Sequence, residues 1–338
     1  MNGLAAPGIR ACALTLLAAA LCGCRQEPAA RSASLEGEAL AIRIVFGSLP
    51  ERMPGGENDT AELAALGRRL YFERGLSANG AQSCNDCHRL DGGRAGDDGR
   101  PVSPGARGAL GRRNSPTVLN AGFQDSQFWD GRAADLTEQA KGPMLNPLEM
   151  AMPSAKSVEA RLNRSAGYRA AFAEAFPGQP RPVTYDNAAR AIAAFERTLI
   201  SPAPFDRYLK GEPGALSAGQ RKGLSRFMNT GCIQCHNGVL VGGGLLERLG
   251  IHHPYRNRAD QGLYELTRRN EDRYIFKVPM LRNVTRTPPY FHDGRVATLS
   301  QAIALMARLQ LDTELDQSQA AEIAGFLKAL ESETHPER

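Results

Sequence analysis

The sequence predicts a mainly α-helical fold with two domains in tandem, long loops and little strand. Apolar residues recur at spacings of three and four along several segments, which is the period of an amphipathic helix, whereas strand signals are scarce and short. The pentapeptide Cys-x-x-Cys-His occurs twice, at residues 84–88 and 232–236, and each copy follows a helical segment and a turn of small residues. A chain of 338 residues is long enough for two domains of ordinary size.

The repeated pentapeptide is typical of covalent haem c attachment. Two thioethers would tether each porphyrin, and the histidine that ends each motif would bind the iron axially. The residues concerned are Cys84, Cys87 and His88 in the first copy and Cys232, Cys235 and His236 in the second. A zinc hairpin or chance could explain one copy, but hardly two. We therefore expect two cytochrome c-like domains, each with one haem c, in a protein that moves electrons.

Most of the expected elements are helices. The dipeptide Asp59-Thr60 is a suitable start for the first helix, whose apolar face runs from Leu63 to Tyr71. The same apolar period places further helices at residues 158–176, 187–200, 217–228, 299–309 and 319–330. Pro177-Gly178 ends the first of these, and the helix at 217–228 leads directly into the second motif.

The N-terminus is typical of an export signal. Arg10 precedes an apolar run that ends at Leu21, which suits a signal peptide and is too short to cross a bilayer. The run continues as Leu21-Cys22-Gly23-Cys24, which resembles a bacterial lipoprotein cleavage box with Cys24 as the lipidated residue. An ordinary cleaved signal with incidental cysteines is the alternative. Acyl chains on Cys24 would anchor the protein on the periplasmic side of a bacterial membrane, with the outer membrane expected.

These features divide the chain into five parts. We expect a signal peptide at 1–23, a flexible tether at 24–40, a first domain at 41–205, a second domain at 206–332 and a tail at 333–338. The formal charge of +5 comes without any Lys/Arg run interleaved with aromatic residues, which argues against nucleic-acid binding. Of the seven cysteines, three lie in the first 24 residues and four in the motifs, so none is left for a disulfide in the body of the chain.

The two motifs are expected to form different iron sites. Methionine and histidine are the usual sixth ligands, and an iron without one is open to substrate. No histidine follows the first motif between Arg89 and Met152, so the first iron is expected to be open. For the second iron, Met306 is the best candidate because it shares a helix face with other apolar residues, although a methionine there is more often part of the core.

Several further motifs resemble those of the bacterial dihaem cytochrome c peroxidases, in the same order. They are Arg113-Asn114-Ser115-Pro116-Thr117, Phe128-Trp129-Asp130-Gly131-Arg132, Gln139-Ala140-Lys141-Gly142-Pro143, Glu149-Met150, Leu281-Arg282-Asn283-Val284 and Pro289-Tyr290-Phe291-His292-Asp293-Gly294. The resemblance covers about residues 45–330. It implies reduction of hydrogen peroxide to water at the N-terminal haem, with electrons from a small exported cytochrome c or copper protein that pass through the C-terminal haem. Dimers are common in this family.

The resemblance also implies roles for particular residues. Glu149 matches the distal carboxylate that moves a proton between the peroxide oxygens, and Gln139 matches an amide that orients peroxide. Trp129 matches an indole between the two haems that shortens the path for electrons, while Arg132 could pair with a haem propionate. In isolation, these residues would be read as a solvated loop glutamate, an exposed helix residue, a core anchor and a structural ion pair.

Two more sites follow from the resemblance. Met306 lies fourteen residues after His292, as the family pattern requires for the sulfur ligand of the second haem, and His292 is not expected to be a ligand. Asn114, Thr287 and Pro289 match a calcium site, and amide and carbonyl oxygens are hard ligands that suit Ca²⁺.

One position departs from the family pattern. Many members have a histidine in the loop before the Arg113 motif, which caps the first iron until the second haem is reduced, but Ala106 stands there. We therefore expect that no unlocking is needed. A related dihaem enzyme that matures methylamine dehydrogenase also lacks this histidine and oxidises a partner protein, although its second haem has a tyrosine ligand. A non-enzymatic, membrane-tethered electron carrier is the third alternative.

Overall fold

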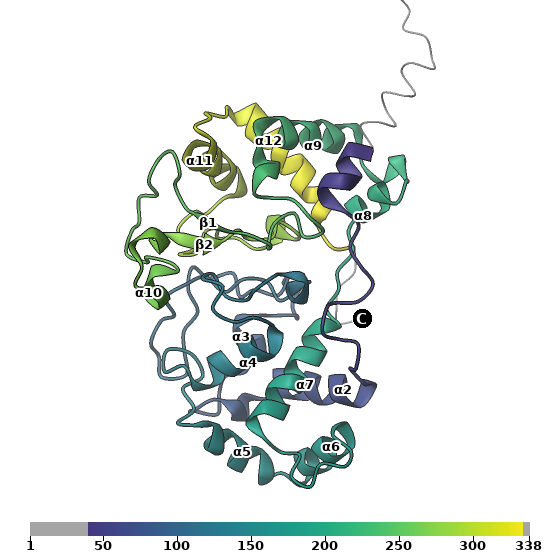
Figure 1. The fold of residues 1–338 in the computed structure, drawn as a ribbon, viewed down its shortest axis with the longest axis vertical. Coiled ribbons are helices and arrows are strands. Elements are labelled where there is room, and N and C mark those ends of the chain that lie inside the picture. The colour runs from purple at the N-terminus through teal and green to yellow at the C-terminus, as the bar shows by residue number, and fades with distance from the viewer. Residues whose placement is uncertain (1–39, 334–338) are drawn as a thin grey trace, which may run out of the picture. The chain divides into compact units, whose positions relative to one another are not determined.

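The computed structural model of the chain describes residues 40–333 (Figure 1). The predicted signal peptide, the lipidation site at Cys24, the tether up to residue 39 and most of the tail lie outside the described residues. From Ala41 onward the residues form one compact unit. Helices and long loops dominate this unit, as predicted, and its strands form one two-stranded sheet. None of the described helices combines the length and apolar character needed to cross a bilayer.

The α-helices have the following bounds in chain order. They are α2 (Ala61–Tyr71), α3 (Cys84–Cys87), α4 (Leu136–Leu145), α5 (Ala155–Asn163), α6 (Ala166–Ala175), α7 (Tyr185–Arg197), α8 (Pro204–Leu209), α9 (Ala218–Thr230), α10 (Tyr264–Thr267), α11 (Leu299–Leu311) and α12 (Gln317–Leu327). Residues 40–46 are also helical. The strands β1 (Leu246–Arg248) and β2 (Ile275–Lys277) pair antiparallel, with Leu246 opposite Lys277.

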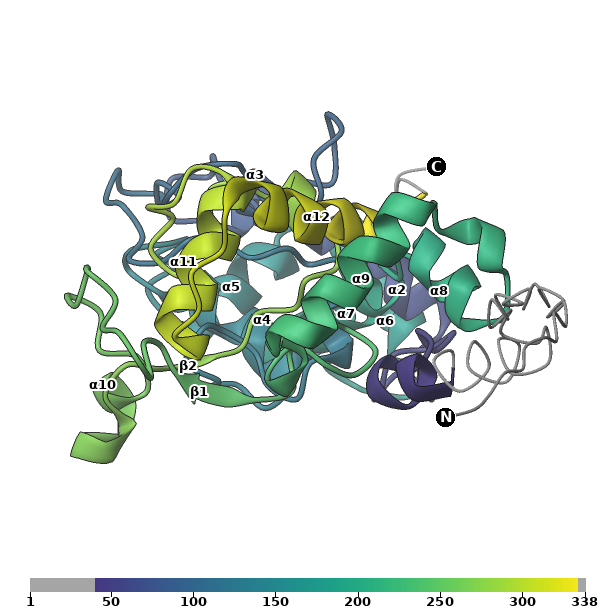
Figure 2. The ribbon, with the colours of Figure 1, turned by 90° about the horizontal axis from the view of Figure 1, so that it is seen from above.

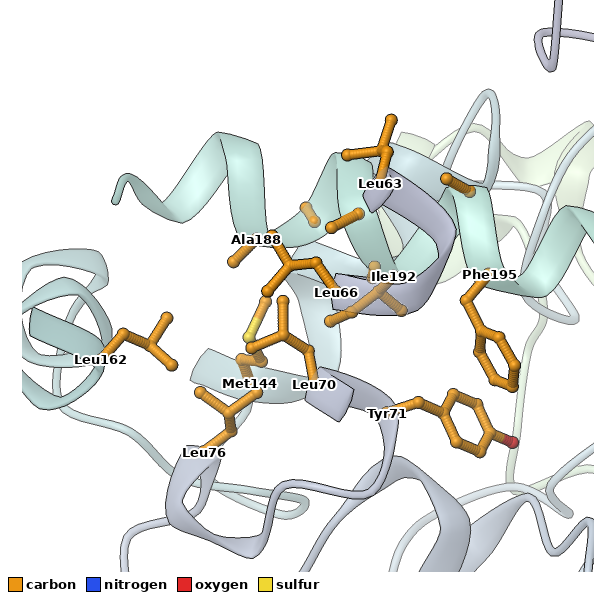
Figure 3. Close-up of a cluster of buried hydrophobic side chains, with 14 of the residues drawn as sticks. Leu63, Leu66, Leu70, Tyr71, Leu76, Met144, Leu162, Ala188, Ile192 and Phe195 are labelled. Atoms are coloured by element: carbon orange, nitrogen blue, oxygen red, sulfur yellow. The ribbon is translucent and has the colours of Figure 1, made fainter. Parts of the chain in front are cut away.

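A first hydrophobic cluster joins α2, α4, α5, α6 and α7 (Figure 3). Leu66 and Leu70 of α2 interlock with Met144 of α4 and Ile192 of α7, and all four side chains are at most 1% exposed. Such apolar burial is the main source of stability for helices of this length. The cluster extends to Cys84, so it fixes the position of the first motif.

A second cluster joins α8, α9 and α12 with the helical residues 40–46, which lie beside α8 and α9 although they come first in the chain (Figures 1 and 2). Its centre is a group of aromatic rings with centroid separations of 5.3–6.4 Å, formed by Phe46, Phe205, Phe227 and Phe326. Cys232 packs against this cluster. The predicted division into domains at residues 205 and 206 stays a prediction, but residues 41–46, which it assigns to the first domain, pack here.

The predicted helix starts agree with the side-chain caps. The Thr60 hydroxyl accepts a hydrogen bond from the Leu63 N–H at the start of α2, and the Ser217 hydroxyl does the same for Gln220 at the start of α9. The single helix predicted at 158–176 is wrong, because α5 ends at Asn163 and α6 begins after Ser165. The Ser165 side chain caps the new helix by accepting from the Tyr168 N–H.

In each cluster, the helix that precedes a haem motif packs on its partner through a glycine. Gly67 of α2 faces α7, and a Cβ built there would overlap the backbone carbonyl of Ala191. Gly223 of α9 faces α12, where a Cβ would overlap the carbonyl of Glu322. Backbone therefore lies directly against backbone at both contacts, and any side chain would force the helices apart.

Replacing either glycine by alanine tests this packing. We expect Gly67→Ala and Gly223→Ala to lower the free energy of unfolding by about 2–3 kcal/mol each, because an inserted methyl in a filled contact costs that much. Chemical denaturation followed by circular dichroism measures the change.

Gly325→Ala in α12 is the matched control, since nothing lies within 4 Å of a Cβ at that position. Alanine there should be neutral or stabilise the helix by up to about 1 kcal/mol. Equal losses at all three glycines would contradict the close-packing account.

Candidate functional site

The first motif folds as the short helix α3, and two hydrogen bonds fix the position of its histidine. The N–H and hydroxyl of Ser83 both donate to the Asp86 carboxylate, which fixes the start of α3. The Nδ1 atom of His88 lies 2.8 Å from the Pro116 carbonyl oxygen, so this nitrogen is the donor and Nε2 is left for an axial bond to iron. The Tyr71 hydroxyl donates to the His88 carbonyl, which ties the histidine to the first cluster.

The second motif follows α9 without a loop. Gly231 has φ +95°, a left-handed conformation that suits glycine, and it turns the chain from α9 into the short 3₁₀ turn Cys232–Gln234. His236 is 8% exposed, and burial lowers its pKa to about 4, so the ring is neutral at neutral pH. A neutral imidazole is the form that binds iron, and its Nδ1 atom lies 3.4 Å from the Val241 carbonyl oxygen.

A large, mainly apolar cavity lies beside the second motif, and we refer to it as the second-motif cavity. Cys232, Cys235 and His236 line it together with Met306 of α11. None of the four motif cysteines forms a disulfide. An apolar hollow with two thiols, a neutral imidazole and a thioether on its walls has the chemistry that haem c requires, so these residues fit the group.

Glu149 is a half-buried carboxyl on the segment that follows α4. Burial raises its pKa, although the charge of Arg132 and a hydrogen bond from Asn146 partly oppose the rise. The Asn146 amide nitrogen donates to Oε1 of Glu149 at 2.9 Å, which leaves Oε2 for a reacting group. Burial raises the pKa of the Cys87 thiol to about 11, and the charges of Asp98 and Glu149 add to this rise, so Glu149 acts electrostatically on the first motif.

Ala106 lies in a loop that is fastened to the Glu149 segment. Its N–H donates to the Glu149 carbonyl at 2.7 Å, and its side chain is only 8% exposed. A Cβ at the preceding Gly105 would overlap the Leu148 carbonyl, so the two backbones are in direct contact. The Ala106 loop therefore lies directly against the Glu149 segment. The side chain at position 106 is a methyl group, which cannot bind iron.

Gln139 lies on α4, and Arg132 lies in the loop before it, where its charge acts on Glu149. Gln139 is half-buried on α4, and among residues 40–333 its amide makes no hydrogen bond to Glu149. Arg132 pairs with Asp130 at 2.9 Å and stacks on Phe128, with the guanidinium carbon 3.5 Å from the ring centroid. The structural ion pair expected for Arg132 is thus present.

The segment Asn114–Thr117 forms a wall shared by the two motifs. Its Pro116 carbonyl binds His88 of the first motif, and its Asn114 carbonyl accepts a hydrogen bond from the Trp129 indole N–H at 2.8 Å. Residues 114–117 and Trp129 also line the second-motif cavity. Trp129 is therefore connected to the first histidine through three residues of backbone.

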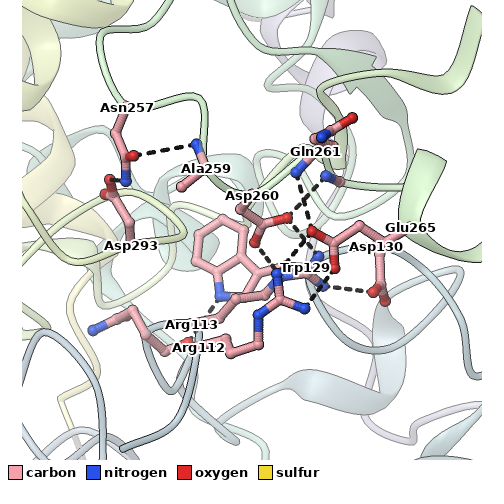
Figure 4. Close-up of polar contacts among 12 residues, drawn as sticks. Arg112, Arg113, Trp129, Asp130, Asn257, Ala259, Asp260, Gln261, Glu265 and Asp293 are labelled. Atoms are coloured by element: carbon pink, nitrogen blue, oxygen red, sulfur yellow. Dashed lines mark hydrogen bonds and ion pairs between the residues drawn. The ribbon is translucent and has the colours of Figure 1, made fainter. Parts of the chain in front are cut away.

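A buried charge cluster holds this wall in place (Figure 4). The Arg113 guanidinium binds Asp130 at 2.5 Å and Asp260 at 2.6 Å, and it joins segments 147 residues apart in the sequence. Burial would raise the pKa of Asp260, but the hydrogen bond and charge of Arg113 outweigh it and keep the carboxyl ionised. Because Asp130 follows Trp129 directly, the cluster also fixes the indole.

The three residues predicted to bind calcium share the second-motif cavity. The Asn114 amide nitrogen donates to the Arg100 carbonyl at 2.8 Å, which leaves the amide oxygen as the atom for a cation. Within the described residues, no group of three or more His, Cys, Asp or Glu side chains could hold a metal. His292 is 2% exposed, lines the same cavity and lies with its ring centroid 6.4 Å from that of Trp129.

Two residues of the site were not predicted from the sequence. Asn146 stands three residues before Glu149 at the end of α4, and an amide at that spacing is a weak signal. Lys277 lines the second-motif cavity at the end of β2, and it is a cation within the otherwise uncharged segment Tyr274–Met280. A charged residue in such a segment could have been noticed.

Comparisons with known proteins place the chain among haem peroxidases. A family model described as di-haem cytochrome c peroxidase matches residues 61–214. The chain is 42% identical over 310 residues to the cytochrome c551 peroxidase of Pseudomonas aeruginosa, a match that covers 90% of this chain and 88% of that protein. It is 43% identical over 276 residues to the cytochrome c551 peroxidase of Nitrosomonas europaea, with 80% of each chain covered.

The fold is similar to that of a solved MauG-like protein associated with microbial copper homeostasis. The TM-score is 0.76 at 28% identity, and the match covers 86% of this chain and 95% of that one.

Proposed function

The chain belongs to the di-haem cytochrome c peroxidase family, and from this premise we propose how its own residues divide the work of the peroxidase. Hydrogen peroxide takes up two electrons and two protons and gives two waters. In our proposal this occurs beside Glu149 at the first motif, with electrons that enter at the second motif. Haem c bound at the two motifs would supply the redox chemistry, one group receiving electrons and the other reducing peroxide.

The single observation that carries this proposal is the half-buried carboxyl of Glu149, whose charge acts on Cys87 of the first motif. Burial raises the pKa of this carboxyl above its usual range, which makes it a stronger base for a proton that it must first accept and then return. Glu149 takes a proton from one peroxide oxygen through Oε2 and delivers it to the other oxygen, which leaves as water. Asn146 holds Oε1 throughout, and so keeps the carboxyl in one orientation. Gln139 is proposed to orient peroxide from α4.

Electron entry is proposed at the second motif, where His236 and Met306 would be the two axial ligands. Both residues line the same apolar cavity, His236 at the end of the second motif and Met306 on α11. A thioether ligand raises the potential of a haem and closes it to substrate. Trp129 and the backbone of Asn114–Pro116 then provide the bonded route from this cavity to His88. The donor would be a small cytochrome c or copper protein.

A protein substrate is the second candidate. The likeness to a MauG-like structure and the alanine at position 106 favour it. Met306 in the second-motif cavity favours the peroxidase with a small donor. Steady-state oxidation of reduced cytochrome c by peroxide distinguishes them, because rapid turnover is expected only of the first. A purely electron-carrying role is set aside, since the relatives are named as peroxidases.

Three further features belong to the proposal. The apolar run that ends at Leu21 supports export, and the sequence Leu21-Cys22-Gly23-Cys24 supports a lipid anchor at Cys24. Together they would place the enzyme on the periplasmic side of the membrane. One Ca²⁺ would bind at Asn114, Thr287 and Pro289, supported by the free amide oxygen on the wall between the motifs. A homodimer is retained from the family resemblance alone.

Glu149→Gln tests the proton-transfer role. The amide keeps the shape of the carboxyl but cannot exchange the proton, so we expect kcat to fall about 100-fold or more while both haems stay bound. Stopped-flow peroxide reduction with reduced cytochrome c measures this loss. Glu138→Gln on α4, an exposed glutamate paired with Lys141, is the control and should keep full activity. Undiminished turnover in the Glu149 variant would remove the carboxyl from the mechanism.

Asn146→Ala tests the tuning of that carboxyl. The base form of Glu149 is needed, so activity declines as the pH falls through its pKa. The Asn146 hydrogen bond favours the charged form and lowers this pKa, so its removal should shift the acidic limb of the kcat/KM profile to higher pH. Asn163→Ala on the surface of α5 is the control. A profile that stays in place, or moves to lower pH, would be inconsistent with this assignment.

A further inference from the structure

The second-motif cavity contains very little fixed positive charge. Among its lining residues, all of them within the described part of the chain, two side chains other than histidine are cationic, Lys277 and Arg282. A haem c bound there, as the proposed function requires, would bring two propionate carboxylates into or to the edge of an apolar cavity. Buried carboxylates need charged or hydrogen-bonding partners. The question is which of the two cations can serve.

Arg282 is already paired with a carboxylate. Its two terminal nitrogens donate to the two carboxylate oxygens of Asp206, each at 2.7 Å, and Nε donates to the Val239 carbonyl at 2.7 Å. The residue is 1% exposed. In this bidentate pair the Asp206 carboxylate balances the charge of the guanidinium, so Arg282 offers no unpaired charge to a second carboxylate.

Lys277 is buried with unused donors. The residue is 7% exposed, and its ammonium donates to the Ser126 carbonyl at 2.8 Å. An ammonium has three N–H donors, and within the described residues this is the hydrogen bond that it makes. Asp130 attracts it electrostatically, but that carboxylate is bound by Arg113 and Arg132. Lys277 thus lines the cavity, and in the part of the chain that the structure describes its amine has no carboxylate of its own within hydrogen-bond distance.

We propose that Lys277 binds a propionate of the haem at the second motif, and that this ion pair fixes the haem relative to Trp129. The backbone supports the second part of the proposal. The Lys277 N–H donates to the Trp129 carbonyl at 2.7 Å, and its ammonium holds Ser126 of the same loop. Lys277 therefore binds the loop that carries the Trp129 indole. Its remaining N–H donors would bind the haem carboxylate.

The burial of Lys277 explains why its amine would bind a propionate. Burial lowers the pKa of Lys277 to about 7, so without an anion beside it the amine would be half neutral at neutral pH. A carboxylate within hydrogen-bond distance favours the charged form and restores the proton. A positive charge next to the haem in turn stabilises the reduced iron over the oxidised iron, since reduction removes one positive charge.

The experiment compares Lys277→Gln and Lys277→Arg with the wild-type protein, with Lys222→Gln as the matched control. Lys222 lies on α9 just before the second motif but is exposed and paired with Glu322, so water screens its charge. Spectroelectrochemical titration gives the midpoint potential of the haem at the second motif. Infrared difference spectra between oxidised and reduced protein, with ¹³C in the haem propionate carboxyls, report the carboxylate directly.

We expect Lys277→Gln to lower the midpoint potential and shift the labelled carboxylate band, and Lys277→Arg and Lys222→Gln to leave both close to wild type. An unchanged potential and band in Lys277→Gln would overturn the proposal, as would an equal fall in Lys277→Arg, because that would reflect packing and not charge. Haem content and circular dichroism confirm that each variant is folded and loaded.

Different results would contradict the peroxidase role and the Lys277 ion pair. A wild-type protein that binds two haems but does not reduce peroxide would contradict the peroxidase role, whatever the Lys277 variants do. A fully active enzyme whose potential and carboxylate band ignore Lys277 would contradict only the ion pair.

Discussion

The backbone of Asn114–Pro116 is the constraint on which the rest of the arrangement depends. One carbonyl of this segment orients His88, and another, two residues earlier, holds the Trp129 indole at the second-motif cavity. Neither hydrogen bond can shift without the other, because a peptide segment of three residues has few free torsions. The two sites are therefore built on one rigid wall, and a short bonded route between them follows from the geometry of that wall.

Charge fixes this wall more than apolar packing does. Arg113 is mostly buried and binds Asp130 on one side and Asp260 on the other. Buried ion pairs add little net stability, because desolvation offsets their attraction, but they tolerate only one geometry. We infer that the charge cluster fixes the position of the Asn114–Pro116 segment and adds little to the stability of the fold. Stability comes instead from the two apolar clusters, in which α2 packs on α7 and α9 on α12 through glycine contacts, and each cluster reaches a cysteine of its own motif.

The sequence predicted what local pattern determines. Helix α2 was predicted from Thr60 and its apolar spacing, and α9 from its apolar spacing, because caps and periodicity are properties of a few neighbouring residues. The break before α6 was missed, although Ser165 is a readable cap. The contact between Pro116 and His88, and that between Lys277 and the Trp129 loop, could not be predicted, since each joins residues distant in sequence through a carbonyl that any residue could supply. The sequence motifs predicted which chemical groups form the site, whereas backbone contacts between distant residues determine how these groups are arranged.

The proposed mechanism requires a difference between the two iron sites, in which the first would be open beside Glu149 and Ala106 and the second would be closed by Met306. Low-temperature electron paramagnetic resonance of the fully oxidised, haem-loaded protein tests this most directly, because an open ferric haem is high-spin and a His/Met haem is low-spin. We predict one high-spin and one low-spin signal of equal amount before any reductant is added. Two low-spin signals without a high-spin component would mean that a protein side chain closes the first site as well, and would contradict the account.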